Sequence, residues 1–295
     1  MLIIASLGCA ATTPIVSANL IDFYLPQREE LLFKKHPLPL LAEYGSHEQR
    51  LGFAAVVHSS DPRSPTFRML DRSFRIIRPA AVILEGFPTG WGPNPARVMV
   101  KLTAPADPTD SYEAGEDMYA ARLARSSGAT VWGAEPEEAE IAAELRKAGF
   151  AERDIFFASM FGPLAQDLEA KVFKGPEDPA FDGAYRKWAK LNAKNYDPVA
   201  PLSSDAFQTW FRQNYARALR DDPEWFTRGG PGQRGIAGKI GRASNRIRDQ
   251  HMFLLALRLI KTNRRVLVVA GGSHLSSQWR ALATALAAPQ LSSQR

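Results

Sequence analysis

The 295-residue sequence contains very little cysteine and no long hydrophobic run. Its single cysteine, Cys9, excludes an intrachain disulfide framework and any zinc cluster built from cysteines. Every internal apolar run is far shorter than the roughly 18 residues needed to cross a bilayer, so we expect no internal transmembrane helix. Hydrophobic residues make up 45% and charged residues 23% of the chain. This composition is typical of a globular fold and excludes a disordered, collagen-like or coiled-coil protein.

Three common functional motifs are also missing. The sequence has no Gly-x-Ser-x-Gly segment, which argues against a serine hydrolase of the α/β type. The glycines of Gly230–Gly235 match a dinucleotide-binding pattern in letters, but no expected strand precedes them. Gly238-Lys239 is followed by Ile240, where a phosphate-binding loop needs serine or threonine. We therefore expect neither a dinucleotide site nor a phosphate loop.

The positive charge of the chain is concentrated in one stretch. The formal net charge is +6, yet residues 209–265 alone hold 13 Lys/Arg against 4 Asp/Glu. A basic stretch can bind nucleic acid, but this one carries no recognisable nucleic-acid motif. A solvated helical face with a few arginines directed at anions explains the same charge. We expect no nucleic-acid partner.

The first 18 residues favour export. Residues 1–11 form a short apolar run, and Val16-Ser17-Ala18 resembles a cleavage site with small residues, but the positive segment that usually starts a signal peptide is missing. Alternatively, Gly8-Cys9 is a lipoprotein processing site, although Ser6 stands where leucine is usual. A mis-assigned start or a buried first element are further alternatives. We expect an exported protein, periplasmic or lipid-anchored, with membrane association only through this signal or its lipid.

Hydrophobic patterns predict alternating strands and helices. Residues 50–57 and 80–84 form short apolar runs, which predict buried strands. Between them, Ser64-Pro65 supplies a helix cap and a first-turn proline, so we expect a parallel β-α-β unit. The other expected strands are 130–134 and 265–270, and the other expected helices are 116–127, one opening at Glu135-Pro136, 243–260 and a last one after Gly271. The predicted class is α/β, with a mixed or mostly parallel central sheet flanked by helices.

One segment interrupts this alternation. Residues 161–241 are rich in proline, and residues 228–241 are rich in glycine. Aromatic residues are interleaved through the segment: Phe181, Tyr185, Trp188, Phe207, Trp210, Phe211 and Trp225. We interpret 161–241 as a helical insertion or lid within one domain, whose α/β core consists of residues 19–160 and 242–295. The aromatic residues suit either a substrate lid or a binding surface.

Polar side chains stand at or near the ends of the predicted strands. They are His58, Glu85, Glu135 and His274. Ligands of open α/β sheets bind beyond the carboxyl ends of parallel strands, where these four residues are expected to meet. Two imidazoles and one or two carboxylates suit a divalent-metal site with a position left for water. Each residue also has a structural explanation: a strand-end histidine is often only hydrogen-bonded, and Glu135 suits a helix start.

The helix expected at 243–260 adds an arginine to this group. Arg248, His251 and Met252 share one helical face, and the helix is apolar beyond Met252. An arginine at the edge of a buried segment needs an anionic partner. Arg248 therefore pairs with a carboxylate of the site or polarises a substrate carbonyl, unless it forms a local salt bridge with Asp249. We expect Asp249, His251, Glu135 and Gly271 to support the site residues.

These motifs, in this order, resemble those of the TraB/TIKI superfamily, which is related to ChaN-like proteins and erythromycin esterases. Gly271-Gly272-Ser273-His274 resembles its second Gly-x-x-His segment, Arg248–Met252 its arginine helix, and Val82–Gly86 its glutamate strand. His58 stands at the first histidine, but Ala55 replaces the glycine of that motif. His47, after Gly45, is a rival with spacing one residue short. The resemblance covers roughly residues 44–285.

The resemblance implies a divalent-metal-dependent hydrolase of the peptidase or esterase type. His58, Glu85 and His274 would be metal ligands or acid/base groups, with Mn, Co or Zn as the cofactor. Glu85 would be the general base if it is not a tight ligand, and Arg248 would hold the oxyanion. A metal-activated water would then attack a carbonyl of a peptide or small-molecule substrate. Since other members are haem-binding, the alternative is a non-catalytic, exported binder of haem or a small ligand.

Overall fold

The computed structural model describes residues 26–89, 92–95, 115–196, 203–221, 234–287 and 290–293. The expected signal segment 1–18 and Cys9 lie outside these residues. The chain divides into two compact units. The first unit comprises Met1–Pro136 and Arg248–Arg295, and the second comprises Glu137–Ile247. In the described part of the chain, no helix combines the length and apolarity needed to cross a membrane.

A six-stranded sheet forms the centre of the first unit, in the order β4-β3-β5-β2-β1-β6. The pairs β2–β5, β5–β3 and β3–β4 are parallel, whereas β1 pairs with β2 and with β6 in antiparallel fashion. The predicted α/β class with a mixed, mostly parallel sheet is therefore confirmed. The strands are β1 (Leu40–Gly45), β2 (Arg50–Val56), β3 (Ala81–Pro88), β4 (Thr130–Glu135), β5 (Arg265–Gly271) and β6 (Gln290–Ser293).

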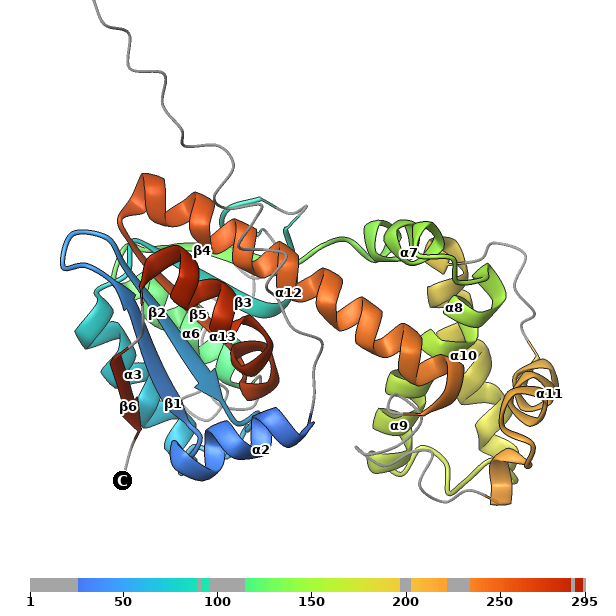
Figure 1. The fold of residues 1–295 in the computed structure, drawn as a ribbon. Coiled ribbons are helices and arrows are strands. Elements are labelled where there is room, and N and C mark those ends of the chain that lie inside the picture. The colour runs from blue at the N-terminus through green and yellow to red at the C-terminus, as the bar shows by residue number, and fades with distance from the viewer. Residues whose placement is uncertain are drawn as a thin grey trace, which may run out of the picture. The chain divides into compact units, whose positions relative to one another are not determined.

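Helices cover both faces of this sheet (Figure 1). Ile83 and Val268 point into the apolar cluster under α12 and α13, whereas Val82 and Val269 point into the cluster under α3 and α6. Because both faces are buried, the central strands are almost continuously hydrophobic. The helices of the first unit are α2 (Pro26–Lys35), α3 (Pro65–Ile77), α6 (Gly115–Ser126), α13 (Gly272–Leu286) and the part of α12 (Gly235–Asn263) from Arg248 onward.

The predicted β-α-β unit is present as β2–α3–β3. Ser64 caps α3 by accepting a hydrogen bond from the backbone N–H of Thr66, and Pro65 is the first helical residue. β2 and β3 run in the same direction, but β5, near the end of the chain, lies between them. The carboxyl ends of β2, β5 and β3 are therefore neighbours along one edge of the sheet, although they are far apart in sequence.

Three boundaries differ from the prediction. Glu135 is the last residue of β4 and does not open a helix, because α7 starts at Glu138 with Glu137 as its cap. β3 continues beyond Glu85 to Pro88. α12 starts at Gly235 and not near residue 243. Its first two turns contain glycines, each of which costs a helix about 1 kcal/mol, but burial of apolar side chains in the second unit offsets this cost.

The second unit is helical, and its boundaries are wider than the expected insertion at 161–241, since it comprises Glu137–Ile247. The aromatic residues noted in the sequence form its core: Phe181, Tyr185, Phe207, Trp210 and Phe211 are buried, and Trp188 packs against them. Trp225 lies outside the described residues. These rings are core residues and not an exposed binding surface. The helices are α7 (Glu138–Lys147), α8 (Glu152–Ser159), α9 (Phe161–Glu169), α10 (Pro179–Tyr196), α11 (Ser204–Tyr215), η2 (Leu219–Asp221) and the start of α12.

Candidate active site

The carboxyl edge of the parallel strands gathers most of the site residues predicted from sequence. His58 follows β2, Glu85 lies in β3, Glu135 ends β4 and Gly271 ends β5. The sheet order β4-β3-β5-β2 makes these strand ends consecutive. α13, which starts directly after β5, supplies His274. The geometry follows from the parallel register and is the reason His58 and His274 both lie beside Glu85.

Glu85 is the centre of the site and is mostly buried. His274 Nε2 lies 3.0 Å from Oε1, the backbone N–H of Gly271 donates to Oε2 at 2.6 Å, and an Arg248 terminal nitrogen lies 3.5 Å from Oε1. Burial by itself raises the pKa of this carboxyl. The hydrogen bond and charge of His274, the Gly271 N–H and Arg248 outweigh burial and hold the pKa well below its usual range. Glu85 is therefore an ionised carboxylate at neutral pH.

His274 lies between two carboxylates. Its Nδ1 is 2.7 Å from Asp249 Oδ1, and its Nε2 faces Glu85. Burial lowers the pKa of this imidazole, but the charge and hydrogen bond of Asp249, together with Glu85, raise it to about 10. Ser277 and Gln278 also donate to the Asp249 carboxylate and fix its position. His274 is thus an imidazolium with both ring nitrogens engaged.

His58 is the exposed histidine of the site. Its Nδ1 bonds to Glu116 Oε1, and the other oxygen of Glu116 accepts from the backbone N–H of Ser59 at 3.0 Å. The hydrogen bond to Glu116 raises the pKa of His58, against the opposing effect of burial. The His58 side chain is 58% exposed, and its Nε2 lies 3.9 Å from Glu85 Oε2. The free ring nitrogen therefore faces both solvent and the central carboxylate.

Arg248 is held by carboxylates from two strands. It forms an ion pair with Glu135 Oε1, an oxygen that also accepts from the backbone N–H of Gly86 at 3.1 Å. Burial opposes the charged form of Arg248, but Glu135 and Glu85 raise its pKa. Asp249 bonds to His274, and its negative charge also acts on Arg248. A guanidinium therefore lies beside Glu85.

Two other histidines named in the sequence lie elsewhere in this unit. His251 bonds through Nε2 to the hydroxyl of Thr89, which donates to the Glu135 carbonyl oxygen at 2.8 Å. His251 thus supports the segment that holds Glu135. His47 lies in the turn before β2, at the opposite end of the strand from His58. Of the two candidate histidines, His58 and not His47 therefore lies at this edge of the sheet.

Gly271 lies close to both His58 and Glu85, and its lack of a side chain leaves room for them. A Cβ atom on Gly271 would lie 3.0 Å from His58 Nε2 and 3.5 Å from Glu85 Oε2. A side chain there would fill the space between the two groups. The glycine predicted to support the site therefore keeps the gap between the imidazole and the carboxylate open.

The predicted metal ligands His58, Glu85 and His274 do not fit a divalent metal as they are arranged. As the side chains are arranged, His274 Nδ1 bonds to Asp249 and its Nε2 bonds to Glu85, so neither ring nitrogen is open to a further ligand. Among the described residues, no group of three His, Cys, Asp or Glu side chains is suited to hold a metal ion. We therefore derive no reaction step through a metal.

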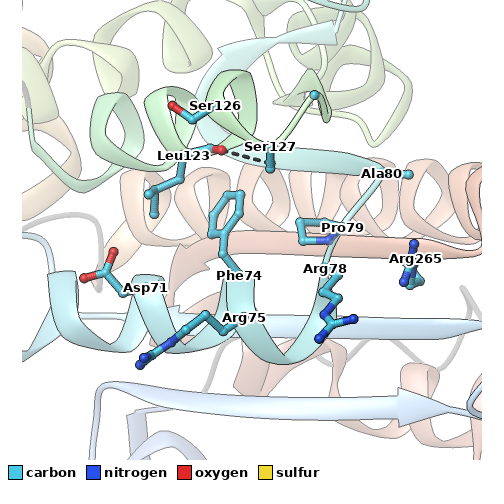
Figure 2. A pocket seen from close by; sticks show the side chains of 11 residues that line it. Asp71, Phe74, Arg75, Arg78, Pro79, Ala80, Leu123, Ser126, Ser127 and Arg265 are labelled. Atoms are coloured by element: carbon cyan, nitrogen blue, oxygen red, sulfur yellow. Dashed lines mark hydrogen bonds between the residues drawn. The ribbon is translucent and has the colours of Figure 1, made fainter.

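A cavity of about 780 Å³ lies at the other edge of the sheet, between the ends of α3 and α6 (Figure 2). Phe74 forms its apolar wall, and Arg75, Arg78 and Arg265 stand at its border. All three arginine side chains are exposed to water, so no bound anion is needed to explain their positions. The cavity contains none of the linked acid and base groups described above, so we assign the chemistry to the Glu85 edge despite the size of this cavity.

Glu116 was missed by sequence reasoning. It stands in the first turn of α6, where an acidic residue is explained by the helix dipole. Glu116 is 58 residues from His58 in the sequence, so no motif spacing links the two. The feature that could have indicated it is the acidic pair at the start of α6, a helix that packs on β3.

Comparison of the chain with known protein families, curated proteins and solved structures finds no match. The likeness to the TraB/TIKI superfamily therefore stays an interpretation of short motifs.

Proposed function

We propose that this protein is a hydrolase that cleaves an ester or amide bond of a peptide or small molecule with water. The observation that carries this proposal is the pair formed by His58 and Glu85. Their facing atoms are 3.9 Å apart, which is too far for a direct hydrogen bond and suits one bridging water. An imidazole and a carboxylate that both accept hydrogen bonds would orient that water and increase its nucleophilicity.

His58 is the general base in this proposal. Its Nδ1 is engaged by Glu116, so Nε2 is the nitrogen that accepts the water proton. The Glu116 carboxylate stabilises the imidazolium that forms, as a carboxylate does behind any catalytic histidine. The exposure of His58 fits this role because a substrate must reach the water from solvent.

Arg248 and His274 supply positive charge around the reacting atoms. Arg248 lies beside Glu85, and in this proposal its positive charge stabilises the oxygen that becomes negative when water attacks the carbonyl. His274 is buried and holds Glu85 ionised and correctly oriented, with Asp249 behind it. In this proposal His274 is a positioning residue and not a proton acceptor.

The pH dependence of a Glu116→Gln variant tests the role of His58. In the wild type, kcat/KM should rise with pH as His58 loses its proton, at a pH above the ordinary value of about 6.5. Because the Glu116 hydrogen bond raises the pKa of His58, removing the carboxylate should move this rise to lower pH. The plateau should also fall by about 10²-fold, since general base catalysis is weakened.

The measurement is a pH profile of kcat/KM for the p-nitrophenyl and ethyl esters of acetic acid and N-acetylphenylalanine. Glu144→Gln is the matched control, because Glu144 is exposed on α7 in the second unit. A Glu116→Gln profile that coincides with that of the wild type would show that another group is the base. Absence of hydrolysis by the wild type would contradict the proposed function itself.

A further inference from the structure

Asp117 is a titratable group of the site that the reaction above does not use. It follows Glu116 in the first turn of α6. Its Oδ2 lies 3.7 Å from the position of a Cβ atom on Gly86, so the carboxyl group lies over the backbone directly after Glu85. Gly86 has a φ of +82°, which favours glycine and leaves this approach open. Asp117 therefore reaches the Glu85 edge of the sheet from the helix side.

The surroundings of Asp117 disfavour a negative charge. The negative charges of Glu116, Glu85 and Glu135 all act on its carboxyl group, and among the groups that act most strongly on it only His58 opposes them. Arg248 is engaged with Glu135 and Glu85. In the part of the chain that the structure describes, Asp117 has no ion pair with a cation and no hydrogen bond. Burial and these like charges raise the pKa of Asp117 well above its usual range.

No cation of the neighbouring helix α3 is among the groups that act most strongly on Asp117. On α3, the acidic residue Asp71 accepts a hydrogen bond from Tyr119 of α6 at 2.8 Å and so faces another part of that helix. A proton on Asp117 itself is therefore the simplest way to neutralise the cluster. A carboxylic acid kept protonated next to a general base is the pairing that a hydrolytic site needs.

We propose that Asp117 is the acid that protonates the leaving group, so that the site acts on amides and alkyl esters. This inference rests on the hydrolase proposed above and adds a second catalytic residue to it. Amide nitrogen and alkoxide leave poorly unless they gain a proton as the bond breaks. An activated leaving group such as p-nitrophenolate needs no such help.

The proton balance of the cycle closes without a further reactant. The water oxygen forms a bond to the carbonyl carbon while His58 Nε2 takes one water proton. The C–N or C–O bond then breaks, and the leaving atom takes the proton of Asp117. The proton on His58 returns to the Asp117 carboxylate through water. One water is consumed, and a carboxylic acid and an amine or alcohol are released.

The test uses Asp117→Asn, which keeps the size and neutrality of a protonated aspartate but has no acidic proton. We expect kcat/KM for the ethyl esters of acetic acid and N-acetylphenylalanine to fall by about 10²-fold. For the p-nitrophenyl esters of the same acids, we expect a change of less than about 3-fold, since general acid help is not needed. Asp71→Asn, on the neighbouring helix α3, is the control and should alter neither ester, because Asp71 bonds to Tyr119 and is not among the groups of the proposed site.

A second readout does not depend on activity. Carbon-13 NMR of aspartate-labelled protein should contain a carboxyl resonance that titrates above the normal aspartate range and is missing in Asp117→Asn. Because the pKa of Asp117 is raised in the folded state, its contribution to stability is complete at low pH and is lost as pH rises above about 3.9. Asp117→Asn has no group that ionises there, so it should be more stable than the wild type at alkaline pH.

The outcomes separate the two proposals. A wild type that hydrolyses none of the esters contradicts the hydrolase and with it the role of Asp117. An active wild type with equal loss on both ester types in Asp117→Asn contradicts only the leaving-group role, as does a normal titration of Asp117. Stabilisation of the wild type by Mn²⁺ that disappears in Asp117→Asn would show that Asp117 holds a cation and would also overturn the inference.

Discussion

Replacing His58 with alanine is expected to lower kcat for ester hydrolysis by about 10³-fold, which is within the usual contribution of a general base. His58 is the exposed imidazole that faces both Glu85 and solvent. Its loss also removes the hydrogen-bond partner of the buried Glu116, so some stability should be lost. His58→Gln keeps a donor for Glu116 and should show the same loss of kcat without that structural effect.

His47→Ala is the matched control, because it removes an imidazole from the other end of β2. Steady-state kinetics of the three variants should show loss only at His58. Added imidazole should restore part of the activity of His58→Ala, since it can replace the missing base. Equal activity of His58→Ala and His47→Ala would contradict the role given to His58.

Asp249→Asn should have the largest effect on stability, a loss of about 3 kcal/mol in the first unit. Asp249 is 2% exposed and accepts hydrogen bonds from His274, Ser277 and Gln278. Without its charge, His274 is a buried imidazolium that only Glu85 compensates. The pKa of His274 is raised to about 10. The stability that the raised pKa of His274 contributes is complete below about pH 6.5 and is lost as pH rises through about 10.

Hydrogen–deuterium exchange between pH 5 and 10 tests this prediction. Amides of β5 and α13 should exchange faster in Asp249→Asn, and the difference from the wild type should shrink as pH approaches 10. The helix α10, in the second unit, is an internal control and should not change. Asp221→Asn is a matched surface substitution because Asp221 is largely exposed. An Asp249→Asn protein with wild-type exchange at every pH would refute the buried ion pair.

The central strands could be predicted because burial on both faces leaves a plain hydrophobic signal. The runs 50–57 and 265–270 predicted β2 and β5, whose observed bounds are Arg50–Val56 and Arg265–Gly271. β6 was not predicted, since it is a short edge strand that pairs only with β1 and has the polar sequence QLSS. β1 was also not predicted, and its antiparallel pairing depends on the turn before β2. Edge strands are specified by their neighbours more than by their own sequence.

The site was predictable only where strand ends define it. His58 follows β2, Glu135 closes β4 and Glu85 lies in the second half of β3, and the parallel sheet brings these residues together. Glu116 and Asp117 were not predicted, because acidic residues at a helix start have an ordinary explanation in the helix dipole. Which carboxylate each histidine contacts depends on side-chain packing. The sequence therefore suggested His274 as a metal ligand, whereas the structure gives it two carboxylate partners.

The most direct test of the account is a single-turnover hydrolysis in ¹⁸O-labelled water, with the wild-type protein in excess over N-acetylphenylalanine ethyl ester. If the water between His58 and Glu85 attacks the carbonyl directly, mass spectrometry should find one ¹⁸O atom in the released acid and none in the protein. Transfer of the label to the peptide that contains Glu85 would show that this carboxylate attacks the substrate itself. That result, or the absence of any hydrolysis, would contradict the proposed role of the His58–Glu85 pair.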